Sequence, residues 1–385
     1  MPDTNGVKRG PRPHAYLADL PACPHGSIGD AELSALSLGR DDVLDFSAST
    51  NPLGPSPRVR EALAHFATAG ALGRYPDDGS RGLRDALAAQ TGGTPSQVIV
   101  ANGSVEILWL LALAYLAPGD RALVVGPTFG EYARVARIMG SAVMEWRARA
   151  MASFHPDPAE VANVIRRACP RVVFLCNPNN PTGALLDHAA VAQLLAPLGD
   201  GLLVVDEAYV AFVDAAPDLT PLLADGRLLL VRSLTKDYGL AGLRLDYALG
   251  APDVIDALDR VRPPWNVNAM AEAAGLAALA DGAHLARAQR EVADARTYLV
   301  GALTDLGLRV YPATANFLLV DVQRWQRGDV VGSDGRAFRA ALLRHGICVR
   351  DCASFGLPDC VRIGVRTQSA CARLVAATAE ALAHA

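Results

Sequence analysis

The stretch 227–250, RLLLVRSLTKDYGLAGLRLDYALG, places a single lysine between two apolar runs. This residue, Lys236, is one of only two lysines in the 385-residue chain, and the other, Lys8, lies in a start rich in proline and glycine. Arginine serves as well as lysine for surface charge, but it stays protonated and cannot condense with an aldehyde. The sequence therefore indicates a reaction that needs a primary amine at position 236.

The two runs around Lys236 belong to a series of short apolar segments that starts near Gln97. Each has about four to six aliphatic or β-branched residues without polar alternation, which is typical of strands buried on both faces. The segments are QVIVANGS, RALVVGPTF, RVVFLCNPNN, GLLVVDEAY, RLLLVRSLTK and LDYALGAP. Helical spacers such as VEILWLLALAYLAPGD separate them, so the sequence predicts an α/β fold with a mostly parallel sheet between helices.

The pattern divides the chain into three parts. Residues 1–45 are weakly patterned and predict an N-terminal arm, and residues 46–262 hold the apolar runs and predict a large ligand-binding domain. From about residue 263, a long helical region rich in alanine, leucine and arginine leads to RVYPATANFLLVDV, GICVRDC and CVRIGVR. Residues 263–385 therefore predict an interdomain helix followed by a smaller α+β domain.

Composition narrows the possible partners. The chain is 51% hydrophobic and 20% charged, and its net charge of -4 comes without a basic block, which argues against nucleic acid and acidic membrane surfaces. No stretch reaches the roughly 20 apolar residues of a membrane span. Seven cysteines in an irregular set without CxxC indicate neither a disulfide framework nor a zinc site. We expect a cytoplasmic protein with a small-molecule substrate and no metal.

Polar residues follow four of the predicted strands, at the point where each strand ends. In an open parallel sheet, ligands bind outside the carboxyl ends of the strands. The residues at these ends are Gly103 and Ser104 after VIVA, NPNNPTG at 177–183, Asp206 and Tyr209 after LLVV, and Ser233, Thr235 and Lys236 after LLLV. One crevice would thus combine an anion site, an amide, a carboxylate, a phenol and an amine, which suits a pyridine aldehyde that carries a phosphate.

Each group has a chemical role with such a ligand. Lys236 would form an imine with the aldehyde and later act as the base at the substrate Cα. Asp206 would keep the pyridine nitrogen protonated, and Asn180 and Tyr209 would donate hydrogen bonds to the ring oxygen.

The phosphate would take a second group of residues. These are Ser104 with the backbone N–H groups at Gly103, and Ser233, Thr235 and Arg244. Phe129, after LVVGPT, could stack on the ring.

Each of these residues alone has a simpler explanation. Asp206 could cap a helix, Asn180 could serve turn geometry, and Gly103 with Ser104 could form an N-cap. Phe129 could be a core residue, and Arg244 a surface arginine. Their joint occurrence, in chain order and around Lys236, favours the ligand site.

The motifs NPNNPTG, VVDEAY and SLTKDYGLAGLR, with Arg244 eight positions after Lys236, resemble the fold type I aminotransferase family, which uses pyridoxal 5′-phosphate. The resemblance extends from about residue 44 to the C-terminus. It implies that Lys236 is the Schiff-base lysine, Asp206 the partner of the pyridinium nitrogen, and Arg244 the phosphate arginine. It also assigns Tyr209 and Asn180 to the ring oxygen.

The same resemblance implies a homodimer in which a tyrosine reaches the phosphate of the neighbouring subunit. Tyr75, in RYPDDGSRGLRDALA, matches that position, and a core tyrosine near a turn is the alternative.

Two subgroups of the family compete. LDFSASTNPLGPSP, the early His25-Gly26 and CVRDCASFGLPDCVRIGVR resemble threonine-phosphate decarboxylase, an enzyme of cobalamin biosynthesis. The near relative is histidinol-phosphate aminotransferase, which shares NPNNPTG and the SLTK region but usually has a glycine at the position of Arg366. The decarboxylase group typically has HGG where this chain has HGS, so His25 is either a substrate contact or a turn residue.

Three arginines near the C-terminus indicate the charge of the substrate. Arg362 matches the substrate-carboxylate arginine of the family, and Arg350 and Arg366 flank it within seventeen residues. We therefore expect an amino acid substrate that is phosphorylated or otherwise dianionic, although exposed strand arginines are an alternative. The bond at Cα that stands perpendicular to the ring plane is the one that breaks, and subgroup resemblance favours decarboxylation over transamination.

Other enzyme classes fit less well. The SxxK pattern with Ser233 also occurs in serine acyl-transfer enzymes, but these need a KTG element, and the chain has no third lysine. A nicotinamide dehydrogenase would show GxGxxG after a strand, which is absent from the sequence. A binding protein without catalysis would not need Lys236.

Overall fold

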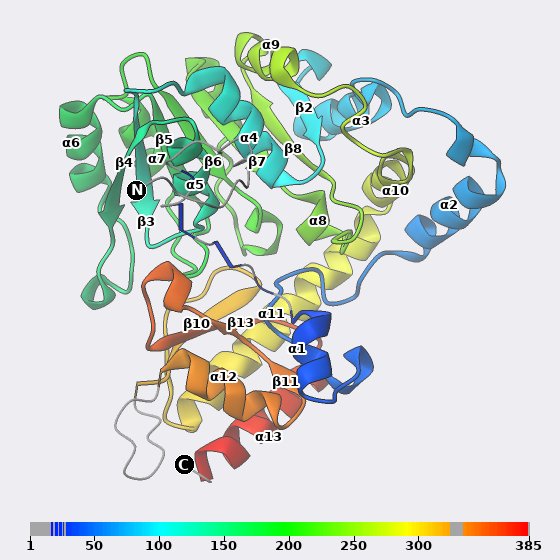
Figure 1. The fold of residues 1–385 in the computed structure, drawn as a ribbon, viewed down its shortest axis with the longest axis vertical. Coiled ribbons are helices and arrows are strands. Elements are labelled where there is room, and N and C mark those ends of the chain that lie inside the picture. Colours follow the sequence, from blue (N-terminus) through cyan, green and yellow to red (C-terminus); the bar gives the residue numbers. More distant parts are fainter. Residues whose placement is uncertain are drawn as a thin grey trace, which may run out of the picture.

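The computed structural model describes residues 17, 20–21, 23–24, 26, 28–323 and 334–383. A large part with a wide sheet lies above a smaller part in Figure 1, and helix α11 (Gly282–Asp305) runs from one to the other. This arrangement confirms the predicted α/β fold with a mostly parallel sheet and a smaller α+β unit. Within the described residues, no helix is both long enough and apolar enough to cross a bilayer.

The large sheet has seven strands in the order β2-β8-β7-β6-β5-β3-β4. Their bounds are β2 (Val98–Ala101), β3 (Arg121–Gly126), β4 (Ala142–Arg147), β5 (Val172–Cys176), β6 (Leu202–Asp206), β7 (Leu228–Arg232) and β8 (Asp246–Gly250). All neighbouring pairs are parallel except the two that involve β8, which is antiparallel to β2 and to β7. The β7-β8 pair encloses the loop that carries Lys236.

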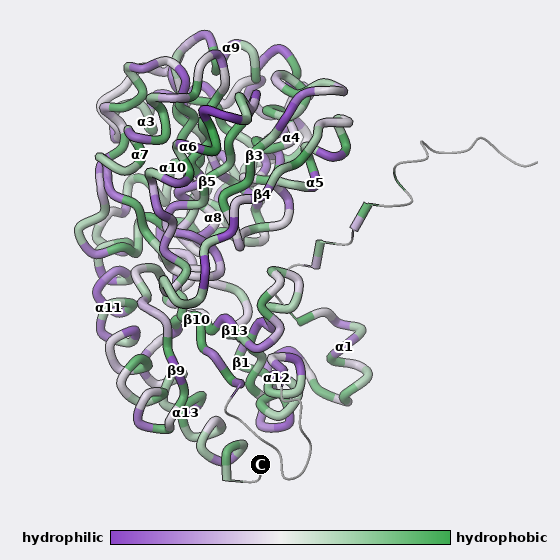
Figure 2. Tube along the Cα trace, turned by 90° about the vertical axis from the view of Figure 1, so that its left-hand side faces the viewer, coloured by the Kyte–Doolittle hydropathy of each residue, from purple (hydrophilic) through white to green (hydrophobic). Residues whose placement is uncertain are grey.

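Helices cover both faces of this sheet, which explains its continuous apolar strands. On β5, Val173 and Leu175 face one hydrophobic cluster, whereas Val172 and Phe174 face the other. The first face packs against α2 (Pro57–Thr68), α3 (Arg81–Thr91), α6 (Pro158–Ala168), α7 (His188–Leu195) and α10 (Ala269–Leu279). The second packs against α4 (Ser104–Tyr115), α5 (Glu131–Ile138) and α9 (Pro252–Val261). Hydrophobic residues accordingly concentrate along central strands such as β3 and β5 (Figure 2).

The small part is built on an antiparallel sheet in the order β12-β13-β10-β9. Its strands are β9 (Arg309–Val310), β10 (Phe317–Asp321), β12 (Arg350–Asp351) and β13 (Cys360–Gly364), and β1 (Leu44–Asp45) pairs in parallel with β11 (Ile347–Cys348) beside it. Helices α11, α12 (Gly335–Leu343) and α13 (Gln368–Ala383) complete its core, in which Leu299, Phe338 and Leu374 are fully buried.

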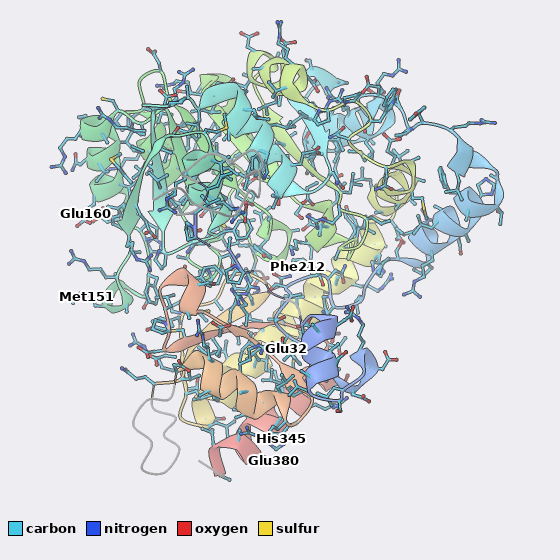
Figure 3. The ribbon with its side chains drawn as sticks, in the orientation of Figure 1. Glu32, Met151, Glu160, Phe212, His345 and Glu380 are labelled. Atoms are coloured by element: carbon cyan, nitrogen blue, oxygen red, sulfur yellow. The ribbon has the colours of Figure 1, made fainter. Side chains whose placement is uncertain are left out.

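Helix α1 (Asp30–Ala35) packs on the small part. Glu32, which Figure 3 labels, accepts a hydrogen bond of 2.9 Å from Nη2 of Arg339 in α12. Leu33 lies in a small hydrophobic cluster with Leu343. The end of the predicted N-terminal arm is therefore held on the small part, and the domain boundaries at residues 45 and 262 stay a prediction.

Candidate active site

A cavity of about 670 Å³ lies between the large and the small part. The large part contributes residues at or just after the ends of its strands, among them Asn180, Asp206 and Lys236. The small part contributes Arg350 and Arg362 from its sheet. The cavity thus lies outside the carboxyl ends of the parallel strands, where the sequence predicted a ligand site.

Lys236 belongs to the one-turn helix α8 (Leu234–Asp237) at the floor of this cavity. The side chain of Ser233 caps this helix and accepts a hydrogen bond of 3.2 Å from the backbone N–H of Lys236. The carbonyl of Lys236 accepts one of 2.9 Å from Asn51. Its Nζ lies 5.8 Å from the centroid of the Tyr209 ring. The backbone is therefore fixed at both ends, and the amine shares the cavity with the phenol.

Asp206 ends β6 as a buried carboxylate. Tyr132 donates a hydrogen bond of 2.7 Å to Oδ2, and the backbone N–H of Ala208 donates one of 2.9 Å to Oδ1. Burial raises the pKa of Asp206 to about 6, while these two hydrogen bonds act in the opposite direction. A carboxylate that is buried and aligned in this way favours a cationic partner in the cavity.

Tyr132 was not predicted from the sequence, although it stands only three residues after Phe129. It lies on α5 and its ring stacks on Phe174 at 5.3 Å. Phe129 lines the cavity and meets Tyr132 edge to face at 5.6 Å. The spacing could have indicated two aromatic residues around the start of α5, but not the contact of Tyr132 with Asp206.

Arg362 joins three segments of the site. It donates through Nη1 to Oδ1 of Asn180 and through Nη2, at 2.7 Å, to the carbonyl of Ser47. Its guanidinium lies 5.5 Å from the Phe317 ring. Within the described residues, its buried Nε has no hydrogen-bond partner. The side chain is therefore held in place and keeps a donor that a ligand could use.

Arg350 is also buried beside the cavity. Its Nη2 donates to the carbonyl of Pro24 at 2.9 Å and to Oγ of Ser354 at 2.6 Å. Burial lowers its pKa from the ordinary value. The third predicted arginine, Arg366, does not line the cavity, and its carbonyl accepts a hydrogen bond from the thiol of Cys371.

The large part adds arginines that sequence reasoning missed. Arg134 and Arg137 on α5 and Arg147 at the end of β4 line the cavity. Arg147 donates to Glu145 at 2.6 Å and to the carbonyl of Phe355 in the small part at 2.8 Å. These residues lie in segments of ordinary surface composition, so the sequence carries no signal for them.

The start of α4 forms the opposite end of the site. Gly103 has φ +87°, and a side chain there would collide with the guanidinium of Arg244. The glycine therefore lets Arg244 lie against the helix start, where backbone N–H groups and the helix dipole favour an anion.

An unpredicted carboxylate occupies this end. Asp246, which lines the cavity, accepts hydrogen bonds of 2.6 Å from Ser104 N–H, 2.6 Å from the Ser233 hydroxyl and 3.0 Å from Thr235 N–H. The signal in the sequence is an acid at the start of the otherwise apolar run LDYALG.

Two predicted residues lie away from the cavity or outside the described chain. Tyr75 is 78% exposed and its ring stacks on Trp265 at 4.4 Å. His25 falls outside the described residues, although its neighbours Pro24 and Gly26 line the cavity.

The cavity presents the donor set that pyridoxal 5′-phosphate needs: an amine at Lys236, a buried carboxylate at Asp206, a phenol at Tyr209 and a guanidinium at a helix start. These groups fit an aldehyde, a pyridine nitrogen, a ring oxygen and a phosphate, respectively.

Comparisons with known proteins agree with this chemistry. The family described as aminotransferase class I and II matches residues 41–377. Histidinol-phosphate aminotransferase from Moorella thermoacetica is 37% identical over 374 residues, which cover 96% of this chain and 92% of that protein. The enzyme of the same name from Symbiobacterium thermophilum is 38% identical over 351 residues, covering 90% and 92%.

Among solved structures, histidinol-phosphate aminotransferase from Sinorhizobium meliloti in complex with pyridoxal-5′-phosphate matches with a TM-score of 0.84. The match covers 98% of this chain and 99% of that one at 24% identity. It shows that the two chains share one fold.

Proposed function

Because the chain belongs to the class I and II aminotransferase family and uses pyridoxal 5′-phosphate, we propose that it transfers the amino group of histidinol phosphate to 2-oxoglutarate. The observation that carries this proposal is the identity of 37% to a histidinol-phosphate aminotransferase over 96% of the chain. These relatives do not support the decarboxylase of cobalamin biosynthesis that the subgroup resemblance favoured. They support the alternative, amino transfer.

The cofactor, when bound, supplies an aldehyde that takes up the amino group and a ring that withdraws electrons from the substrate carbon. Nζ of Lys236 holds that aldehyde and then moves the proton at the carbon that carries the amine. Asp206 keeps a proton on the ring nitrogen. Asn180 and Tyr209 would donate hydrogen bonds to the ring oxygen, and Phe129 would pack against the ring.

The start of α4 would hold the phosphate of the cofactor. Gly103, Ser104 and Arg244 provide the helix N–H groups and the guanidinium. Ser233 and Thr235 add their donors from the Lys236 loop.

Two anionic substrates alternate in the rest of the cavity. Arg362, with its open Nε, suits the carboxylate of glutamate through a planar guanidinium. Arg350 and Arg147 add positive charge for the phosphate of histidinol phosphate. The cavity volume of about 670 Å³ leaves room for a cofactor and a small substrate together.

The test is a pair of parallel incubations. The purified holoenzyme with histidinol phosphate and 2-oxoglutarate should form glutamate, and omission of 2-oxoglutarate should stop the reaction. The same enzyme with O-phosphothreonine should release no CO₂. Release of CO₂ without formation of glutamate would overturn the proposed reaction.

We also infer a homodimer in which Tyr75 reaches the cofactor phosphate of the partner. The exposed Tyr75 and Trp265 form a stacked aromatic pair, and exposed Leu72 and Leu276 add apolar surface, which suits contact with a second copy.

Mixed dimers provide the test. At limiting cofactor, the Tyr75→Ala protein should have low activity, and the Lys236→Ala protein should have none. Refolding the two together should restore activity, because one site of each mixed dimer then has both residues. No gain of activity on mixing would contradict a shared site.

The predicted cytoplasmic location stays a prediction.

A further inference from the structure

The carboxylate of Asp246 is the feature of the site that amino transfer does not explain. It is 1% exposed, and it lies among the donors assigned to the cofactor phosphate. The N–H of Ser104 donates a hydrogen bond to Oδ2, and the Ser233 hydroxyl and the N–H of Thr235 each donate one to Oδ1. Three donors from two separate segments therefore already have an anionic partner within the protein.

A phosphate at this end would need the same donors. Helix-start N–H groups and hydroxyls bind phosphate oxygens through charge-assisted hydrogen bonds. A phosphate dianion and an ionised Asp246 would lie in contact in a buried site, where like charges repel strongly and one of the two takes up a proton. A protonated Asp246 would instead donate its O–H to the phosphate.

Burial, rather than the surrounding charges, favours this protonation. Arg244 is the cation beside Asp246 and acts against its protonation, and the charge of Asp246 in turn raises the pKa values of the nearby carboxyls Asp206 and Asp237. Burial raises the pKa of Asp246, and the hydrogen bonds from Ser233, Thr235 and Ser104 act against that rise.

Two more charged groups lie on the adjoining elements. Glu106, in the first turn of α4, accepts hydrogen bonds from Asn102 N–H and the Asn266 amide instead. The Lys236 amine adds positive charge on the side of Asp206.

We propose that Asp246 couples phosphate binding to proton uptake: its carboxylate holds the anion site when the site is free of phosphate and takes up one proton when phosphate enters. This inference rests on the proposed place of the cofactor phosphate at α4. It makes cofactor affinity dependent on pH and assigns to Asp246 a positioning role, since it acts through Ser104, Ser233 and Thr235.

The first measurement is the affinity of the apoprotein for pyridoxal 5′-phosphate between pH 7 and 9, followed by absorbance. Once Asp246 is ionised in the free protein, uptake of one proton makes affinity fall tenfold for each pH unit. In Asp246→Asn, this tenfold fall per pH unit should be absent. The variant should therefore bind pyridoxal 5′-phosphate more tightly than the wild type at pH 9. Subtracting the pH dependence of Asp246→Asn removes the contributions of the cofactor and of all other groups of the protein.

The second measurement counts protons directly. Calorimetric titration with pyridoxal 5′-phosphate in two buffers of different ionisation enthalpy should show one more proton taken up by the wild type than by Asp246→Asn. Inorganic sulfate, whose charge is constant over this range, should show the same difference. Neither readout depends on turnover.

Asp237→Asn is the matched control. Asp237, at the end of α8, is also a carboxyl whose pKa burial strongly raises, but it does not line the cavity. This variant should keep the proton uptake of the wild type. If Asp246→Asn does not fold, Asp246→Ser removes the charge while keeping a polar group.

The outcomes separate the proposals. If Arg244→Gln weakens binding of pyridoxal 5′-phosphate but not of pyridoxal, the phosphate lies at α4 as proposed. Equal proton uptake by the wild type and Asp246→Asn then overturns the role of Asp246. If Arg244→Gln leaves both affinities unchanged, the phosphate lies elsewhere and this inference falls with its placement. Normal proton uptake without formation of glutamate overturns only the proposed substrate.

Discussion

At the scale of single residues, the chemistry depends on an amine that no arginine can replace. Lys236 lies on the cavity floor with its backbone fixed by Ser233 and Asn51. Lys236→Arg should keep the fold, because the positive charge and the backbone contacts remain, and it should abolish turnover. Circular dichroism and the glutamate assay measure the two effects. Turnover at the wild-type level in this variant would refute the assignment.

Borohydride provides a chemical check on the same residue. Reduction of the holoenzyme should attach the phosphopyridoxyl group to the peptide that contains Lys236, as read by mass spectrometry. Because Lys8 is the only other lysine, labelling at Lys8 would be clearly distinguished.

The pKa of Asp206 should set the lower pH limit of cofactor binding. Its pKa is raised to about 6 by burial, and the ionised form is the one that pairs with a protonated ring nitrogen. Affinity for pyridoxal 5′-phosphate should therefore fall as the pH drops through about 6. Tyr132→Phe removes a hydrogen bond that lowers this pKa, so the fall should move to higher pH.

The measurement is a cofactor titration from pH 5 to pH 7 for the wild type, Tyr132→Phe and a control. Tyr115→Phe is a suitable control, because Tyr115 lies at the far end of α4 and does not line the cavity. An unchanged midpoint in Tyr132→Phe would show that its hydroxyl does not support the charge of Asp206.

At the scale of elements, the start of α4 needs a glycine for two separate reasons. Gly103 has φ +87°, which other residues rarely adopt, and its missing side chain leaves space for Arg244. Gly103→Ala should weaken binding of pyridoxal 5′-phosphate by at least about tenfold, equivalent to about 1.4 kcal/mol. Absorbance titration measures this, with pyridoxal as the ligand that lacks a phosphate.

Gly119→Ala is the matched control for backbone strain. Gly119 has φ +96°, but a side chain there would meet nothing within 4 Å. The Gly119→Ala variant should lose about 1 kcal/mol of unfolding free energy from backbone strain, as Gly103→Ala should. Its affinity for pyridoxal 5′-phosphate should stay at the wild-type value. Equal affinities in the two variants would mean that the collision with Arg244 has no effect.

The same scale shows how far the sequence could predict the fold. The buried strands were evident because helices on both faces make them continuously apolar, whereas β4 was missed. None of the residues of this edge strand is fully buried, and the charged Glu145 and Arg147 interrupt AVMEWR, so its apolar run is only three residues long. The antiparallel direction of β8 was not predictable, because an apolar run looks the same in either direction.

The sequence likewise predicted some residues of the site and not others. Asn180, Asp206 and Lys236 were predictable because the carboxyl ends of parallel strands meet at one edge. Arg366 was predicted together with Arg362, but β13 ends at Gly364, so strand alternation does not extend to it. Tyr132, Arg147 and Asp246 depend on which way a side chain faces across the tertiary structure, and local sequence does not report that.

At the scale of the whole molecule, Arg296 links the two parts. From α11, its Nη1 donates to the carbonyls of Phe212, which Figure 3 labels, Thr314 and Ala315, and its Nη2 pairs with Asp214. Phe212 lies after β6 of the large sheet, and Ala315 lies before β10 of the small one. One buried guanidinium thus satisfies carbonyls from both.

Arg296→Met should lower the unfolding free energy by roughly 2–4 kcal/mol, because buried carbonyls lose their donor. Urea denaturation measures this. Gln289→Ala is the control, since Gln289 donates one exposed hydrogen bond to the carbonyl of Ala211 nearby, and its loss should be below about 1 kcal/mol. Equal losses in the two variants would show that burial of these carbonyls is unimportant.

The antiparallel β7-β8 pair has a consequence for motion. Lys236 and Arg244 both belong to the single short connection between these two strands, and Asp246 is the first residue of β8. The spacing between the amine and the phosphate end is therefore set by a covalent tether anchored in one sheet. Arg350 and Arg362 belong to another sheet. A hinge movement between the two sheets would therefore change the contacts of these arginines with the substrate and leave the contacts of Lys236 and Arg244 with the coenzyme unchanged.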